Sequence, residues 1–137
     1  MFLNFEFWSF EFLTCLEFGL WCLEFLFRKL GIKERQVKAL VTGGAGFIGS
    51  NVVKVLEAKG AKTVVLDDFS HADYKNVLSA QGEIICGDVL DESLFKKLPA
   101  VDAVIHEAAI TDTTLLDNRK MMMVNFNGFK NVLHYCL

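Results

Sequence analysis

From residue 37 onward, short apolar runs alternate with segments whose apolar residues recur at helical spacing. The apolar runs predict strands over 37–41, 62–66, 83–86 and 101–106. The helical spacing predicts helices over 47–59, 91–98 and 116–136, with a short helix or loop over 73–78. Because strands that alternate with helices are typical of a parallel sheet covered by helices, the predicted fold class is α/β with a doubly wound parallel sheet.

The first predicted strand and helix are joined by the glycine-rich segment Thr42-Gly43-Gly44-Ala45-Gly46-Phe47-Ile48-Gly49-Ser50. A strand, a glycine turn and a helix in this order form the context in which such a pattern binds a dinucleotide, as in the Rossmann fold. Gly43 allows a tight turn, Gly46 lets the backbone approach a pyrophosphate, and Gly49 lets the helix lie close to the sheet. Backbone N–H groups at the helix start, including those of Phe47 and Ile48, are expected to hold the phosphates.

Carboxylates follow the second and third predicted strands. Asp67 and Asp68 come about 20 residues after the glycine turn, where a carboxylate accepts hydrogen bonds from the adenosine ribose and favours NAD over NADP. We expect Asp67 to lie nearer the ribose, and Lys75 is the nearest cation that could hold a 2′-phosphate. Asp88 is a candidate for the adenine amino group, with Val89 against the ring; an ordinary turn is the alternative. The expected cofactor is NAD or NADP.

The fourth predicted strand is followed by Glu107, Ala108 and Ala109, at the carboxyl edge where ligands of such sheets bind. The two alanines leave room for a cofactor. His106 is interpreted as an imidazole hydrogen-bonded beneath the cofactor loop, with a catalytic role as the alternative. Asn125, on the last predicted helix, is expected to reach toward the floor of the site.

Residues 1–27 differ in composition from the rest of the chain. They contain eight of the 13 phenylalanines and both tryptophans, and all their charged side chains are glutamates. Four carboxylates disfavour a membrane-spanning helix, at ~2.5–3.5 kcal/mol for each charge near the bilayer centre. We predict an apolar helix packed on protein; a membrane or surface anchor and an extension without evolved structure are the alternatives. The predicted division is an extension with a charged linker over 1–36 and a dinucleotide-binding domain over 37–137.

Composition excludes several other classes of function. The net charge of −3 provides no basic surface for nucleic acid. The four cysteines form no C-x-x-C pair and have no histidine cluster beside them, so we expect no metal site. Idle or buried thiols are typical of a reducing compartment, and no secretory signal is apparent, so a cytoplasmic location is expected.

In combination, these motifs resemble the extended short-chain dehydrogenase/reductase family, the NAD-dependent epimerases and dehydratases. The resemblance covers residues 37–137 and is carried by Thr42-Gly43-x-x-Gly46-x-x-Gly49, Asp67, Asp88-Val89, His106-x-Ala108-Ala109 and Val124-Asn125-x-x-Gly128. It implies that a bound nicotinamide oxidises a sugar carbon to a ketone and that the hydride then returns to the opposite face.

Finer details are similar to the ADP-L-glycero-D-manno-heptose 6-epimerase branch of that family. They are His106-Glu107, Thr113-Thr114, Asp117, Lys120-Met121-Met122, Asn125 and the closing Leu133-His134-Tyr135-Cys136-Leu137. The positions that depart from the pattern of this branch are Asp68, Ala108, Ile110 and Asp112.

The resemblance also implies a catalytic tyrosine with a lysine four residues later, and this pair is absent from the sequence. The two tyrosines are Tyr74 and Tyr135; position 78 is Leu, and the sequence ends before position 139. We therefore predict the NAD(P)-binding portion of a nucleotide-sugar epimerase, with a truncated sheet and no catalytic residue of its own. A nucleotide sugar is expected as a partner only when a C-terminal half is supplied. The alternative is a non-enzymatic dinucleotide-binding module that docks on a membrane or protein partner through its N-terminal segment.

Overall fold

The computed structural model describes residues 36–111 and 118–137, which belong to the compact unit Arg35–Leu137. Its centre is one parallel sheet of four strands in the order β3-β2-β1-β4. The strands are β1 (Lys38–Thr42), β2 (Lys62–Asp67), β3 (Glu83–Cys86) and β4 (Ala103–His106). The order places β1 beside both β2 and β4, so the predicted α/β class and doubly wound topology are confirmed.

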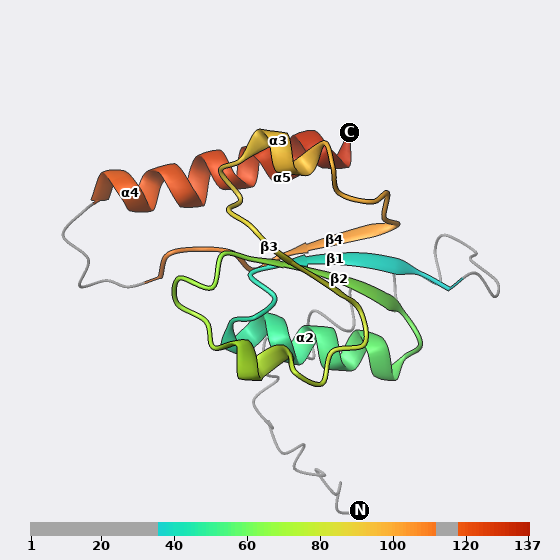
Figure 1. The fold of residues 1–137 in the computed structure, drawn as a ribbon. Coiled ribbons are helices and arrows are strands. Elements are labelled where there is room, and N and C mark those ends of the chain that lie inside the picture. Colours follow the sequence, from blue (N-terminus) through green and yellow to red (C-terminus); the bar gives the residue numbers. More distant parts are fainter. Residues whose placement is uncertain (1–35, 112–117) are drawn as a thin grey trace, which may run out of the picture. The chain divides into compact units, whose positions relative to one another are not determined.

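Helices cover both faces of this sheet (Figure 1). On one face lie α2 (Phe47–Ala58) and the 3₁₀ turn η1 (Tyr74–Val77). On the other lie α3 (Glu92–Phe95) and one long helix made of α4 (Asn118–Met122), the π-helical segment η2 (Met123–Gly128) and α5 (Phe129–Cys136). The prediction of a helix over 91–98 was too long, because α3 ends at Phe95. The predicted segment over 1–27 lies outside the described residues.

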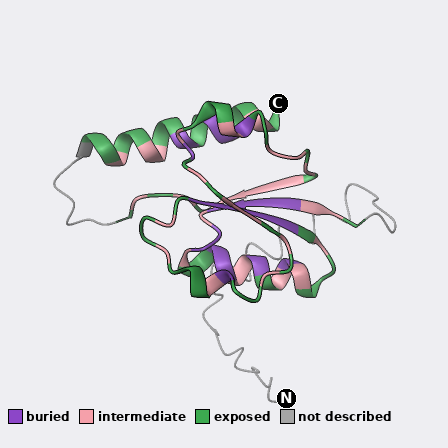
Figure 2. Ribbon diagram, viewed as in Figure 1, coloured by how far each residue is buried: buried purple, intermediate pink, exposed green. Residues whose placement is uncertain are grey.

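The core is built on the two central strands, which are the most buried part of the sheet (Figure 2). Leu40, Val64 and Leu66 are fully buried, and they pack with Phe95 of α3 and Val132 of α5. Continuous apolar burial of this kind is expected for parallel strands that are covered on both faces. The buried centre of the domain therefore lies directly behind the loops that follow β1 and β2.

The long helix contains one turn type that the sequence pattern did not reveal. Residues 123–128 are π-helical, and Gly128 at the end of this segment is buried. A Cβ at Gly128 would lie 2.7 Å from Cγ2 of Val89, so the helix and the loop after β3 approach closely. The side chain of Asn131, also buried, donates to the carbonyl oxygen of Val89 at 3.0 Å. These contacts fix the helix against the carboxyl end of the sheet.

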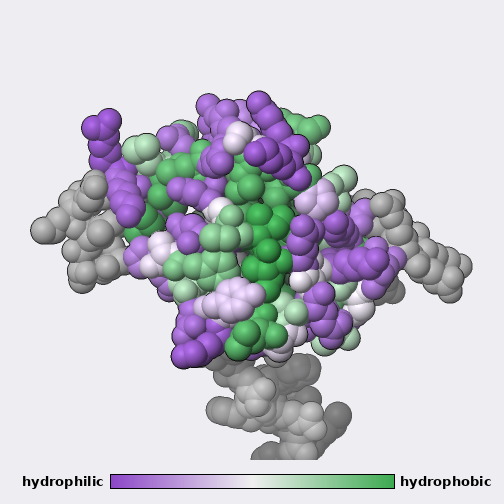
Figure 3. Space-filling model, viewed as in Figure 1, coloured by the Kyte–Doolittle hydropathy of each residue, from purple (hydrophilic) through white to green (hydrophobic). Residues whose placement is uncertain are grey.

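The surface seen in Figure 3 carries a band of hydrophobic residues across its middle, with hydrophilic side chains on both sides. Strand β3 is an edge of the sheet and is only partly buried. Within the part of the chain that the structure describes, no helix has both the length and the apolar character needed to cross a bilayer.

Candidate functional site

The turn after β1 is held in a shape that only glycine tolerates. Gly43 has a φ of +67°, and its N–H donates to the carbonyl oxygen of Leu66 at 2.8 Å. A Cβ on Gly43 would lie 2.5 Å from the backbone nitrogen of Ala108. Gly43 therefore has two roles: it forms the turn, and it allows the loop after β4 to approach closely. The sequence predicted only the first of these roles.

The other two glycines of the motif have different neighbours. A Cβ on Gly49 would overlap the carbonyl oxygen of Gly43 and lie 2.7 Å from Cα of Gly44. The close packing at Gly49 is thus between α2 and the glycine turn itself. A Cβ on Gly46 would meet only the carbonyl oxygen of Gly43, at 3.2 Å, so the space in front of Gly46 is open.

The amino terminus of α2 faces this open space without a side-chain cap. Gly46 is the N-cap residue and makes no capping hydrogen bond. The next residues, Phe47 and Ile48, have exposed side chains. Because the first N–H groups of a helix have no partner within the helix and carry the positive end of its dipole, this terminus is suited to bind an anion.

The two carboxylates at the carboxyl end of β2 differ in their surroundings. Asp67 is only 8% exposed; its Oδ2 accepts from the N–H of Ala45 and its Oδ1 from the N–H of Phe69, both at 2.9 Å. Asp68 is exposed, and its Oδ1 accepts from the N–H of Ser70 at 2.9 Å and from the hydroxyl at 2.7 Å. Asp67 therefore links β2 to the glycine turn, whereas Asp68 faces solvent.

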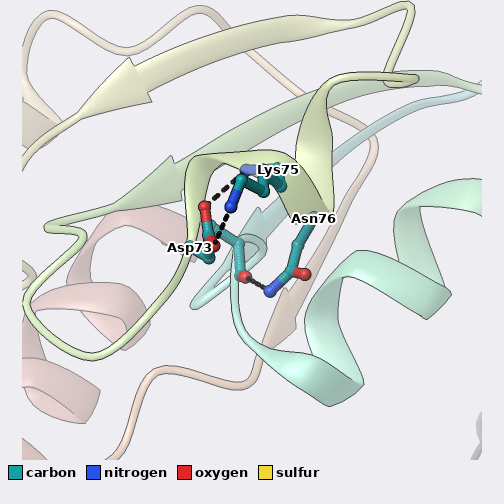
Figure 4. Close-up of polar contacts among 4 residues, drawn as sticks. Asp73, Lys75 and Asn76 are labelled. Carbon is teal, nitrogen blue, oxygen red and sulfur yellow. Dashed lines mark hydrogen bonds and ion pairs between the residues drawn. The ribbon is translucent and has the colours of Figure 1, made fainter.

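The glycine turn is also held by η1 (Figure 4). Asn76 donates through Nδ2 to the carbonyl oxygen of Ala45 at 2.8 Å. Lys75 lies on the same turn, but its Nζ is 3.5 Å from Oδ2 of Asp73 and its side chain is 81% exposed. Ala45 is thus held from both sides, by Asp67 and Asn76, while Lys75 forms a local ion pair.

A cavity of about 400 Å³ opens at the carboxyl ends of the four strands. Nine of the residues predicted from the sequence line it: Gly43, Gly46, Asp67, Asp68, Asp88, Val89, Glu107, Ala108 and Ala109. Five others do not line it: Phe47, Ile48, Gly49, Lys75 and Asn125. Additional lining residues, absent from the prediction, include Ser70, His71, Arg119, Lys120, Met123 and Val124.

The loops around the cavity are fixed by side chains of the long helix. Asn125 accepts from the N–H of Ile110 at 2.7 Å through Oδ1 and donates to its carbonyl oxygen at 2.9 Å through Nδ2. Asn125 thus holds the cavity-lining loop after β4.

Asp88 accepts from the N–H of Leu90 at 2.9 Å, and Val89 is almost completely buried. No group of three metal-ligating side chains is found among residues 36–111 and 118–137.

His106, the last residue of β4, pairs in register with Thr42 of β1 and does not line the cavity. Its Nδ1 is 2.6 Å from Oγ1 of Thr42, and its ring lies 5.7 Å from that of Phe129. Burial lowers the pKa of His106 below its usual value, because desolvation disfavours the charged imidazolium. This geometry agrees with the hydrogen-bonded interpretation of His106, as a link between β1 and β4.

Together, the parallel sheet, the uncapped helix terminus behind a glycine turn and the acidic residue at the end of β2 define a dinucleotide-binding domain of the Rossmann class. Residues 39–137 match the NAD dependent epimerase/dehydratase family. The chain belongs to this family, as the sequence motifs predicted.

Solved structures of similar proteins agree with this assignment. An epimerase from Methanothermobacter thermautotrophicus is 33% identical with a TM-score of 0.69, over 74% of this chain and 32% of that one. A UDP-glucose 4-epimerase from Thermotoga maritima, solved with UDP-glucose, is 28% identical with a TM-score of 0.67, over 72% and 33%. A UDP-glucose 4-epimerase from Thermus thermophilus, in complex with NAD, is 34% identical with a TM-score of 0.63, over 72% and 33%. The chain thus spans about a third of the length of these proteins.

Proposed function

We propose that this chain is the NAD-binding part of a sugar-nucleotide epimerase. The observation that carries the proposal is the cavity of about 400 Å³ in front of the uncapped terminus of α2, with the carboxylates of β2 on its wall. The space in front of Gly46 suits a pyrophosphate, because a side chain there would fill it. The NAD bound to the Thermus thermophilus relative supports the same cofactor here.

Each part of the site has a role in this proposal. The N–H groups at the start of α2 bind the pyrophosphate, and the carboxylates at the end of β2 accept from the adenosine ribose. The Asn125 contact keeps the loop after β4 in place on the opposite side of the cavity. When bound, NAD accepts a hydride from a sugar carbon and returns it.

Two lines of support favour different nucleotide sugars as the substrate. The sequence features shared with the ADP-L-glycero-D-manno-heptose 6-epimerases support a substrate of that kind, whereas the Thermotoga maritima and Thermus thermophilus relatives are UDP-glucose 4-epimerases. Among the features behind the heptose hypothesis, Thr113, Thr114 and Asp117 lie outside the described residues. Glu107 and Lys120 line the cavity. The two substrates are distinguished by parallel turnover assays with ADP-heptose and UDP-glucose. The assayed protein is this chain supplied with a C-terminal half that carries the Tyr-x-x-x-Lys pair.

The purified chain is expected to bind NAD and to catalyse no epimerisation alone. The glycine turn and cavity are present, whereas the printed sequence contains no Tyr-x-x-x-Lys pair. Isothermal titration with NAD measures the binding, and sugar-nucleotide turnover measures the activity. An absence of NAD binding would contradict the proposal, and turnover above that of Gly46→Asp would contradict the inactivity.

Asp67→Ala is expected to weaken NAD binding by about 1.5 kcal/mol, the lower end of the range for a hydrogen bond to a charged group. It should also lower the melting temperature, because the N–H of Ala45 loses its acceptor. Asp68→Ala should affect stability less, since Asp68 is exposed. Lys75→Ala is the matched control outside the cavity, with no expected change in the affinity for NAD or NADP. A larger loss of NAD affinity in Asp68→Ala would assign the ribose contact to Asp68.

A further inference from the structure

Glu107 is the acidic residue that the loop after β4 brings to the cavity. Its backbone N–H donates to the carbonyl oxygen of Thr42 at 2.9 Å, which fixes the start of the loop against β1. The residue is exposed and lines the cavity. Among residues 36–111 and 118–137, its carboxylate has no hydrogen-bond or ion-pair partner. The negative charge of Glu107 is therefore available to whatever occupies that side of the cavity.

The strand order determines which half of a dinucleotide lies near Glu107. Strands β2 and β3 lie on one side of β1, and β4 lies on the other. In this class of site the pyrophosphate binds at the terminus of the helix after β1, and the adenosine ribose binds at the acid after β2. Because the adenosine half occupies the β2 and β3 side, the nicotinamide half extends over the end of β4.

We propose that Glu107 makes the site favour the oxidised over the reduced form of the dinucleotide, an inference that rests on the proposed function. The oxidised nicotinamide ring carries one positive charge and the reduced ring carries none, while the rest of the molecule keeps the same charge. A carboxylate near the ring therefore attracts only the oxidised form. Preferential binding of the oxidised form makes the reduced ring a stronger hydride donor, so Glu107 favours return of the hydride to the oxidised sugar carbon.

Other charges in the cavity do not produce the same effect. Asp67, Asp68 and Asp88 come from the β2 and β3 side, where the dinucleotide is identical in both redox forms. Arg119 and Lys120 line the cavity from α4. Their charges remain when Glu107 is replaced, so their contributions cancel when variant and wild type are compared.

The test is the ratio of the dissociation constants for NADH and NAD⁺, measured by isothermal titration on the full chain at one ionic strength. Glu107→Gln removes the charge while keeping the size of the side chain, and it should lower this ratio by about threefold, as expected for one charge pair in a solvated site. Glu107→Asp keeps the charge and should retain most of the ratio. The matched control is Asp88→Asn, which removes a carboxylate from the adenosine side and should change both constants by the same factor.

ADP is titrated in parallel, because it lacks the nicotinamide half. Normal binding of ADP and NAD⁺ with an unchanged ratio in Glu107→Gln would overturn the role of Glu107 and leave the proposed function intact. An equal fall of the ratio in Asp88→Asn would also overturn it, because the effect would then not depend on the side of the cavity. If the wild-type chain binds neither ADP nor NAD⁺, the proposed function itself fails.

Discussion

Gly46→Asp should abolish measurable NAD binding while leaving the domain folded. Gly46 has a φ of −66° and a ψ of 173°, a conformation that any residue adopts, and a Cβ there meets only one backbone oxygen, at 3.2 Å. Aspartate is also among the best N-cap residues, so its side chain should accept from the first N–H groups of α2. The same N–H groups are those expected to bind the pyrophosphate.

The loss of affinity has two causes that add. The carboxylate takes the N–H groups away from the phosphates, and it places a negative charge beside them. Two charge-assisted hydrogen bonds at about 1.5 kcal/mol each correspond to a loss of at least about 100-fold. Isothermal titration with NAD measures the affinity, and the melting temperature measures the fold.

Gly46→Asn is the matched control for charge, because asparagine also caps helices but is neutral. It should lose less affinity than Gly46→Asp, and both variants should keep a melting temperature close to that of the wild type. An affinity for NAD within threefold of the wild type in Gly46→Asp would show that the phosphates bind elsewhere.

The features that the sequence predicted correctly are those encoded locally. The glycine turn and the buried strands depend on short runs of residues, and Gly43 and Gly46 line the cavity. The sequence could not reveal the different burial of Asp67 and Asp68, because this burial depends on the tertiary contact between the glycine turn and the end of β2. In this contact the N–H of Ala45 lies beside Asp67, whereas Asp68 remains exposed to solvent.

Residues of the long helix were harder to predict for a geometric reason. A regular spacing of 3.6 residues places positions on helix faces, and the π-helical segment 123–128 changes that spacing partway along the helix. The contact of Asn125 with Ile110 lies within this segment, and that of Asn131 with Val89 follows it in α5. The available signal was weak: two asparagines six residues apart, each beside a valine, on a helix expected to bury one face.

Gly49→Ala should destabilise the fold, although alanine is the better helix former. On helix propensity alone the change would stabilise α2 by up to about 1 kcal/mol. The new Cβ would instead overlap the carbonyl oxygen of Gly43 and lie 2.7 Å from Cα of Gly44. Both neighbours are backbone atoms of a turn held by Leu66 and Asp67, so neither can move without breaking those contacts.

The expected loss in the free energy of unfolding is about 3 kcal/mol, the upper range for overpacking a rigid site. Denaturant titration followed by circular dichroism measures it. Gly60→Ala is the matched control: a Cβ there meets no atom within 4 Å, and its φ of +83° alone should cost about 1 kcal/mol. The affinity for NAD should fall in Gly49→Ala and not in Gly60→Ala, because only Gly49 packs against the turn that forms the phosphate site. A Gly49→Ala protein as stable as the wild type would show that α2 can move away from the turn.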